Sequence, residues 1–122
     1  MLRVCESETV EGLGDDVVGV VARGHADRGD KTMVDTLFSA ALGAQSTASR
    51  TTDISQVLTT ASSAATAGMN ATRPLVARKG RASYLGERSA GHLDPGAASS
   101  ALLIHSLADA WRLRAVRCST EP

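Results

Sequence analysis

The residues best suited to chemistry lie in one basic, glycine-punctuated stretch, ARKGRASYLGERSAGHLDPGA, from Ala77 to Ala97. Glycines let a backbone approach a polyanion closely, and guanidinium groups grip phosphate oxygens through paired hydrogen bonds. The stretch runs into a helix start, whose unpaired N–H groups also attract anions. The pattern predicts a phosphate-binding lid. Its cations are Arg78, Lys79, Arg81 and Arg88, and Glu87 is the only acid before Asp94.

Two other interpretations share this composition. A basic surface loop that only solvates the domain has similar charges. A nucleic-acid contact is a second alternative, but Tyr84 is the only aromatic residue in the stretch on which a base could stack. Neither accounts for the spaced glycines or the Asp-Pro-Gly helix start. On composition alone, phosphate binding is therefore only slightly favoured.

Apolar residues at helical spacing predict two helices in the first part of the chain. The first covers about Thr9–Arg23 and ends at Gly24, a residue type that often terminates helices in the left-handed conformation. The second covers about Lys31–Ala44, with Asp30 or Thr32 as its N-cap.

Two further helices follow a small, polar and flexible connection expected over residues 43–52. The third starts after Asp53, and Pro74 is expected to end or kink it, because proline removes a backbone donor and disfavours helix just before it. The fourth has Asp94 as N-cap, continues with Pro95 and runs to about Leu113. Its expected buried face carries Leu103, Leu107, Ala110 and Trp111.

The composition favours an all-α domain. Hydrophobic residues make up 43% of the chain, but many are alanines, and the aromatic residues are only Phe38, Tyr84 and Trp111. Small apolar residues suit closely packed helices, and no run alternates as a strand would. The segment Arg73–Leu93 lacks helical periodicity and is expected to be irregular and to lie near one end of the helices.

Charge is segregated along the chain although the formal net charge is zero. Residues 1–53 hold nine acids and five bases, and residues 54–122 hold four acids and eight bases, so the second part suits an anionic partner. Cys5 and Cys118 lie far apart without metal-ligand spacing, which favours a reduced, cytoplasmic setting. No segment is apolar and long enough for a membrane span, and no signal peptide is expected.

The amino-acid sequence of the basic stretch resembles the loop and helix start near the C-terminus of the dihydroxyacetone (glycerone) kinase L subunit or L domain, the DhaL family. GDKTMVDTL, from Gly29 to Leu37, resembles that family's other recognisable C-terminal segment, and VVARG, Val20 to Gly24, fits the helix end before it. The resemblance covers roughly Thr9 to Trp111. It implies a family domain over residues 9–113, with unassigned tails at 1–8 and 114–122.

This resemblance implies an all-α part of an antiparallel helical barrel, about four helices with a long basic loop that caps a nucleotide at one end. In the family the L unit binds ATP or ADP, and a K subunit or domain holds dihydroxyacetone, which receives the γ-phosphoryl group. The phosphoryl donor is either ATP itself or a phosphotransferase-system phosphocarrier that re-phosphorylates bound ADP. No nucleic-acid or membrane partner is expected.

Carried over position by position, the resemblance implies a nucleotide site of six residues. Gly24 and Met33 match positions beside the nucleotide, with Met33 packed on an adenine, and Arg81 matches the cation that meets the phosphates. The loop-to-helix junction that also touches the nucleotide is Asp94, Pro95 and Gly96. Simpler roles stay open: a helix terminator for Gly24, a core position for Met33 and an N-cap for Asp94.

The resemblance also indicates what this sequence lacks. The family's aspartate-rich Mg²⁺ loop and its glycine/serine phosphate loop have no counterpart here, so no metal ligand and no catalytic residue is assigned. Asp30 and Asp35 are interpreted as cap and solvent-face residues, and His25, His92 and His105 carry no assigned chemistry. We therefore expect a truncated kinase domain, inactive alone. The alternative is a non-catalytic remnant that docks a phosphate-bearing partner through the basic loop.

Overall fold

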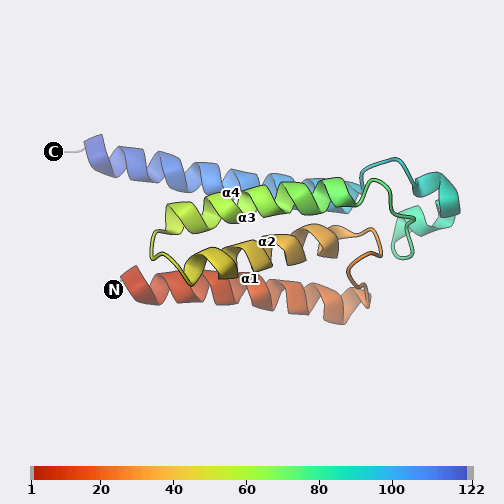
Figure 1. The fold of residues 1–122 in the computed structure, drawn as a ribbon, viewed down its shortest axis with the longest axis horizontal. Coiled ribbons are helices and arrows are strands. Elements are labelled where there is room, and N and C mark those ends of the chain that lie inside the picture. Colours follow the sequence, from red (N-terminus) through yellow and green to blue (C-terminus); the bar gives the residue numbers. More distant parts are fainter. Residues whose placement is uncertain (1, 121–122) are drawn as a thin grey trace.

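The computed structural model describes the backbone of residues 2–120 and the side chains of residues 12, 14–114, 116 and 117. Four α-helices form an elongated antiparallel bundle: α1 (Leu2–Gly24), α2 (Met33–Ala48), α3 (Ile54–Ala71) and α4 (Pro95–Thr120). A 3₁₀ helix, η1 (Arg81–Ser89), lies between α3 and α4, and the described residues contain no strand. The all-α prediction is confirmed. In Figure 1, α1 begins and α4 ends at one end of the bundle, and η1 lies at the opposite end.

Residues 73–93, called the lid from here on, form the irregular segment predicted at one end of the helices (Figure 1). The lid is more ordered than expected because η1 lies inside it. Two 3₁₀ stretches join at Gly86, whose φ of 57° breaks the helix. Glycine is suited to this point because it reaches positive φ without steric cost.

The outer helices are longer than predicted. Helix α1 begins at Leu2, ahead of the expected Thr9, and α4 continues past Leu113 to Thr120. Both added segments lack proline and are rich in residues that lose little freedom in a helix, so nothing in them ends the neighbouring helix. The domain limits at residues 9 and 113 stay a prediction.

Two predicted helix ends are wrong. Helix α1 includes Gly24, and His25 is the residue that turns left-handed, with φ 51° and its N–H bonded to the Val21 carbonyl at 2.8 Å. Helix α2 ends at Ala48 instead of Ala44, so much of the flexible connection expected at residues 43–52 is helical. There the Thr47 hydroxyl donates to the Gly43 carbonyl at 3.1 Å, so this polar side chain bonds back to its own helix.

The core is a layer of small side chains shared by α2, α3 and α4. Two glycines allow this close approach: a Cβ on Gly43 would lie 2.8 Å from the Ala64 Cβ, and one on Gly68 would lie 2.7 Å from the Asp35 carbonyl oxygen. Real Cβ atoms do not approach so closely, so the α2–α3 packing depends on both glycines. The buried cluster is Ala40, Ala44, Val57, Ala61, Ala65, Ala101 and Ile104.

The buried face predicted for α4 is wrong apart from Trp111. Leu103 and Leu107 are 71% and 50% exposed. Because α2 and α3 lie so close, the groove between them, against which α4 packs, accommodates alanines in place of leucines. Helix α4 is therefore rotated so that its alanine face is buried. The residues that it buries are Ala97, Ala101, Ile104 and Ala108, and Trp111 packs partly buried beside Ala108. The four leucines of α4 are therefore exposed on this part of the molecule: Leu102, Leu103, Leu107 and Leu113.

Candidate phosphate-binding lid and its supports

The start of α2 is fixed by a reciprocal cap between Thr32 and Asp35. The Thr32 hydroxyl accepts the Val34 N–H at 3.2 Å, and the Asp35 carboxylate accepts the Thr32 N–H at 3.0 Å. The second Asp35 oxygen accepts the Gly29 N–H at 2.6 Å, which ties the preceding loop to the helix. The cap is therefore Thr32, one of the two predicted candidates, while Asp35 is 8% exposed and not on the solvent face as expected.

Asp30, the other cap candidate, has a different role. Its carboxylate accepts the Asp27 N–H at 2.8 Å within the same loop. Its carbonyl accepts the Arg78 N–H at 3.1 Å, which joins this loop to the lid. The carboxylates of Asp30 and Asp35 thus organise backbone, and this arrangement does not fit a magnesium site.

The start of α4 has the cap that the sequence predicts. Asp94 is buried, its carboxylate accepts the Ala97 N–H at 2.8 Å, and its own N–H donates to the Thr72 hydroxyl at 3.2 Å. Pro95 is the first residue of α4. A Cβ on Gly96 would lie 3.5 Å from the Met33 Cβ, so the first turns of α2 and α4 touch there. Four of the six predicted nucleotide residues are thereby brought together: Met33, Asp94, Pro95 and Gly96.

Arg81 and Gly24 stand apart from this contact. Arg81 is the first residue of η1 and is exposed, and within the described residues no hydrogen bond or ion pair engages its guanidinium. Gly24 is exposed at the end of α1, and a Cβ there would meet no atom within 4 Å. The lid thus offers four unengaged cations at the same end of the bundle as the two helix starts (Figure 1). Arg78, Lys79, Arg81 and Arg88 are exposed, and their side chains have no hydrogen bond or ion pair among the described residues.

The anchored part of the lid surrounds Ser89, which is 3% exposed. Its hydroxyl accepts the Ala77 N–H at 2.8 Å and donates to the Gly86 carbonyl at 2.7 Å, linking three points of the lid. The Gly91 N–H donates to the Arg73 carbonyl at 2.7 Å and closes the base of the lid. This segment is consequently a folded loop with its cations directed outward.

A residue that the sequence interpretation missed lies beneath the lid. Lys31 is 2% exposed, has a left-handed φ of 63°, and its ammonium contacts four backbone carbonyls. The Nζ–O distances are 3.3 Å to Arg73, 3.0 Å to Leu75, 2.6 Å to Ser89 and 2.5 Å to His92. A lysine at the start of a helical pattern gives no local signal of burial, so only tertiary structure shows this role.

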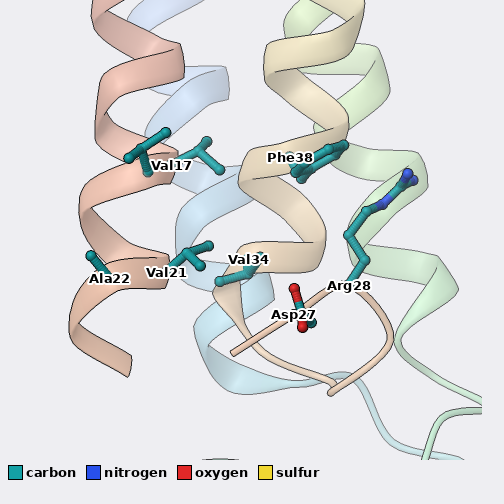
Figure 2. A pocket seen from close by; sticks show the side chains of 8 residues that line it. Val17, Val21, Ala22, Asp27, Arg28, Val34 and Phe38 are labelled. Carbon is teal, nitrogen blue, oxygen red and sulfur yellow. The ribbon is translucent and has the colours of Figure 1, made fainter. Parts of the chain in front are cut away.

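An apolar pocket of about 750 Å³ lies between α1 and α2. Figure 2 shows Val17 and Val21 of α1 facing Val34 and Phe38 of α2, with Arg28 extended beside the Phe38 ring. The Arg28 guanidinium lies 4.6 Å from the ring centroid, a cation–π distance. None of the six predicted nucleotide residues lines this pocket, so it is distinct from the contact between the α2 and α4 starts.

Comparison with known families identifies the domain. The family model described as the DAK2 domain matches residues 3–109. The chain belongs to the DAK2 domain family. The family assigned from the two sequence segments is confirmed, since curated relatives carry the name DhaL.

Three relatives of this DAK2 domain are informative. The PEP-dependent dihydroxyacetone kinase ADP-binding subunit DhaL of Escherichia coli is 43% identical over 94 residues, 77% of this chain and 45% of that protein. The corresponding subunit of kinase 1 from Listeria innocua is 40% identical, over 88% of this chain and 52% of that protein. L-erythrulose 1-kinase of Mycolicibacterium smegmatis is 35% identical, over 85% of this chain and 18% of that protein. The chain spans about half the length of the two DhaL subunits.

The described residues contain neither a membrane-spanning helix nor a cluster of metal ligands. None of the helices there is both long and apolar enough to cross a membrane. No three His, Cys, Asp or Glu side chains gather there as metal ligands would. Cys5 and Cys118, used above to infer a reduced setting, lie outside the residues whose side chains the structure describes.

Proposed function

We propose that this DAK2 domain forms the ADP- or ATP-binding end of a dihydroxyacetone kinase, in which the γ-phosphoryl group passes to dihydroxyacetone held by a K subunit or domain. The observation that carries the proposal is the close approach of Gly96 to Met33, which brings the first turns of α2 and α4 together at the end of the bundle where the lid carries the unengaged Arg81. The names of the relatives, ADP-binding subunits, support the same ligand.

Each part of this end suits one part of a nucleotide. The Met33 side chain is 37% exposed at the start of α2, where a polarisable thioether can pack on a purine. Asp94 holds the first turn of α4 in place through the N–H groups of Ala97 and Ala98, and the Gly96 N–H is left to donate to an anion because Pro95 has none. Arg81 can move onto phosphate oxygens without breaking an existing interaction, because it has none among the described residues.

The metal and the partners are a further part of the proposal. Mg²⁺ accompanies phosphoryl transfer in general, where it neutralises the charge that develops on the phosphates. The carboxylates of Asp30 and Asp35 do not fit it, so we assign no step of the reaction to a metal held by this chain. Two relatives are named PEP-dependent and PTS-dependent kinase subunits, which favours a phosphocarrier protein as phosphoryl source beside the K-type partner.

A second candidate function is non-catalytic binding of a phosphate-bearing partner through the lid. The exposed leucines of α4 support this second function because they offer an apolar surface to another protein. The two functions differ in their need for nucleotide geometry. A docking loop would bind inorganic phosphate and ADP alike, whereas the kinase site would prefer ADP because Met33 adds contacts to the base.

The test is complementation with the part of the family domain that this chain does not cover. The chain is mixed with the N-terminal half of the Escherichia coli subunit, and ADP binding is followed by calorimetry, with inorganic phosphate titrated in parallel. Binding of ADP that inorganic phosphate does not displace supports the kinase site. Equal affinity for the two ligands would favour the docking function.

A further inference from the structure

We propose that Lys31 is the positioning residue of the lid: its buried ammonium binds both arms of the lid and thereby sets where Arg81 stands relative to the start of α2. The inference rests on the proposed nucleotide function for its ligand, but its structural basis is independent of any ligand. Lys31 is not one of the six predicted nucleotide residues, and its ammonium bonds to backbone carbonyls.

The four carbonyls bonded by Lys31 lie on both sides of η1. Arg73 and Leu75 precede it, while Ser89 is its last residue and His92 follows it. One ammonium therefore holds together the beginning and the end of the segment that carries Arg81. Since an ammonium has three N–H groups, four oxygens at these distances share three donors around one centre.

Charge and burial make this contact demanding. An ammonium out of water is costly unless oxygens replace its hydration shell, and buried carbonyls are costly when left without a donor. With Lys31 only 2% exposed, the lid carbonyls supply that shell. The ammonium is the donor to the carbonyls of Leu75, Ser89 and His92, while the Arg73 carbonyl also accepts the Gly91 N–H. The ammonium and these three carbonyls depend on each other, so the lid and the loop before α2 are coupled.

The backbone at Lys31 supports a positional role. Its φ of 63° lies in the left-handed region, which is unfavourable for a residue with a long side chain. Such a conformation persists when surrounding contacts hold it, and it directs the side chain under the lid. Lys31 also immediately precedes Thr32, the N-cap of α2, and lies two residues before Met33. The carbon chain of one lysine therefore links the end of the lid to the proposed base contact.

The first experiment is amide hydrogen exchange on the 122-residue chain without nucleotide. In Lys31→Met the lid loses its central donor, so we expect exchange at the Ala77 and Gly91 amides to rise about tenfold or more, with α2–α3 core amides unchanged. Lys79→Met is the matched control because Lys79 is an exposed lysine of the same loop. Unchanged lid exchange, or an equal rise in lid and core, would overturn the proposal. If Lys31→Met does not fold, Lys31→Gln, which keeps two N–H donors on a shorter chain, gives the same readout.

The second experiment separates positioning from a merely structural role. ADP and adenosine are titrated into the complemented domain carrying the wild-type chain, Lys31→Met or, as the control outside the lid, Arg112→Ala on α4. We expect Lys31→Met to weaken ADP about tenfold while adenosine, which lacks phosphates, changes little. Equal losses for the two ligands, or no loss of ADP, would contradict the assignment. Absence of ADP binding in the wild type would instead refute the proposed function, and the positioning role with it, even where the exchange result shows Lys31 holding the lid.

Discussion

Removing the Arg81 guanidinium is the most direct test of the lid. Arg81 is exposed and engages no partner within the described residues, so Arg81→Ala should leave the fold intact and remove only what ADP gains from the side chain. A hydrogen bond to a charged group contributes about 1.5–3 kcal/mol, which corresponds to a roughly ten- to hundredfold weaker Kd. The assay is calorimetric titration of ADP into the complemented domain.

Two companion variants make this result interpretable. Arg81→Lys should recover only part of the affinity, because an ammonium cannot reproduce the planar two-pronged contact of a guanidinium. Arg112→Ala is the control: Arg112 lies on α4 outside the lid, where its guanidinium contacts Asp109 at 3.8 Å and Thr59 at 3.4 Å. It should change ADP affinity little. Equal losses for Arg81→Ala and Arg112→Ala would mean a diffuse basic surface, and the lid would have no specific phosphate contact.

Three further outcomes are expected. The isolated chain should show no dihydroxyacetone kinase activity in a coupled assay with Mg-ATP and a K-type partner; turnover that disappears in Arg81→Ala would contradict this. Gly68→Ala should destabilise the fold by about 1–3 kcal/mol in urea titration because its Cβ meets α2 backbone, whereas Gly14→Ala, in open space, should be neutral or stabilising. Ile104→Ala should cost about 2–5 kcal/mol and Leu103→Ala about 0.5 kcal/mol or less; the reverse order in thermal melts would mean that α4 buries the leucine face.

The sequence was sufficient where local chemistry decides the structure. Asp94 caps α4 as predicted, since a side-chain oxygen beside a free N–H is a local interaction, and α3 starts directly after Asp53 as predicted. The irregular lid followed from the loss of periodicity between α3 and α4. The family was predicted from the amino-acid sequences of two segments, and the family match over residues 3–109 confirms it. The six predicted nucleotide residues stay a prediction, although the structure brings four of them together.

The orientation of α4 could not be predicted, because it depends on how closely its neighbours approach. Leucines at 103 and 107 and alanines at 97, 101 and 108 both recur at helical spacing, so periodicity alone permits either face to be buried. The glycine contacts at 43 and 68 bring α3 close to α2 and leave a shallow groove, which favours the alanines. Hydrophobicity alone favours burial of the leucine face, which is wrong. The space that α2 and α3 leave for the side chains of α4 decides which face is buried, and that space fits alanines.

Lys31 illustrates the same limit for a polar residue. Its four acceptors are 42 to 61 positions away in the chain, so no local pattern distinguishes it from an exposed lysine at a helix start. What the sequence did contain was GDKTMVDTL as a unit, within which Asp35 fixes Gly29 and Thr32 while Lys31 lies between them. The Asp35 carboxylate holds the loop from which the Lys31 side chain reaches the lid, and the Lys31 ammonium binds the lid carbonyls. The two segments that identify the family are therefore the two sides of one hydrogen-bonded contact.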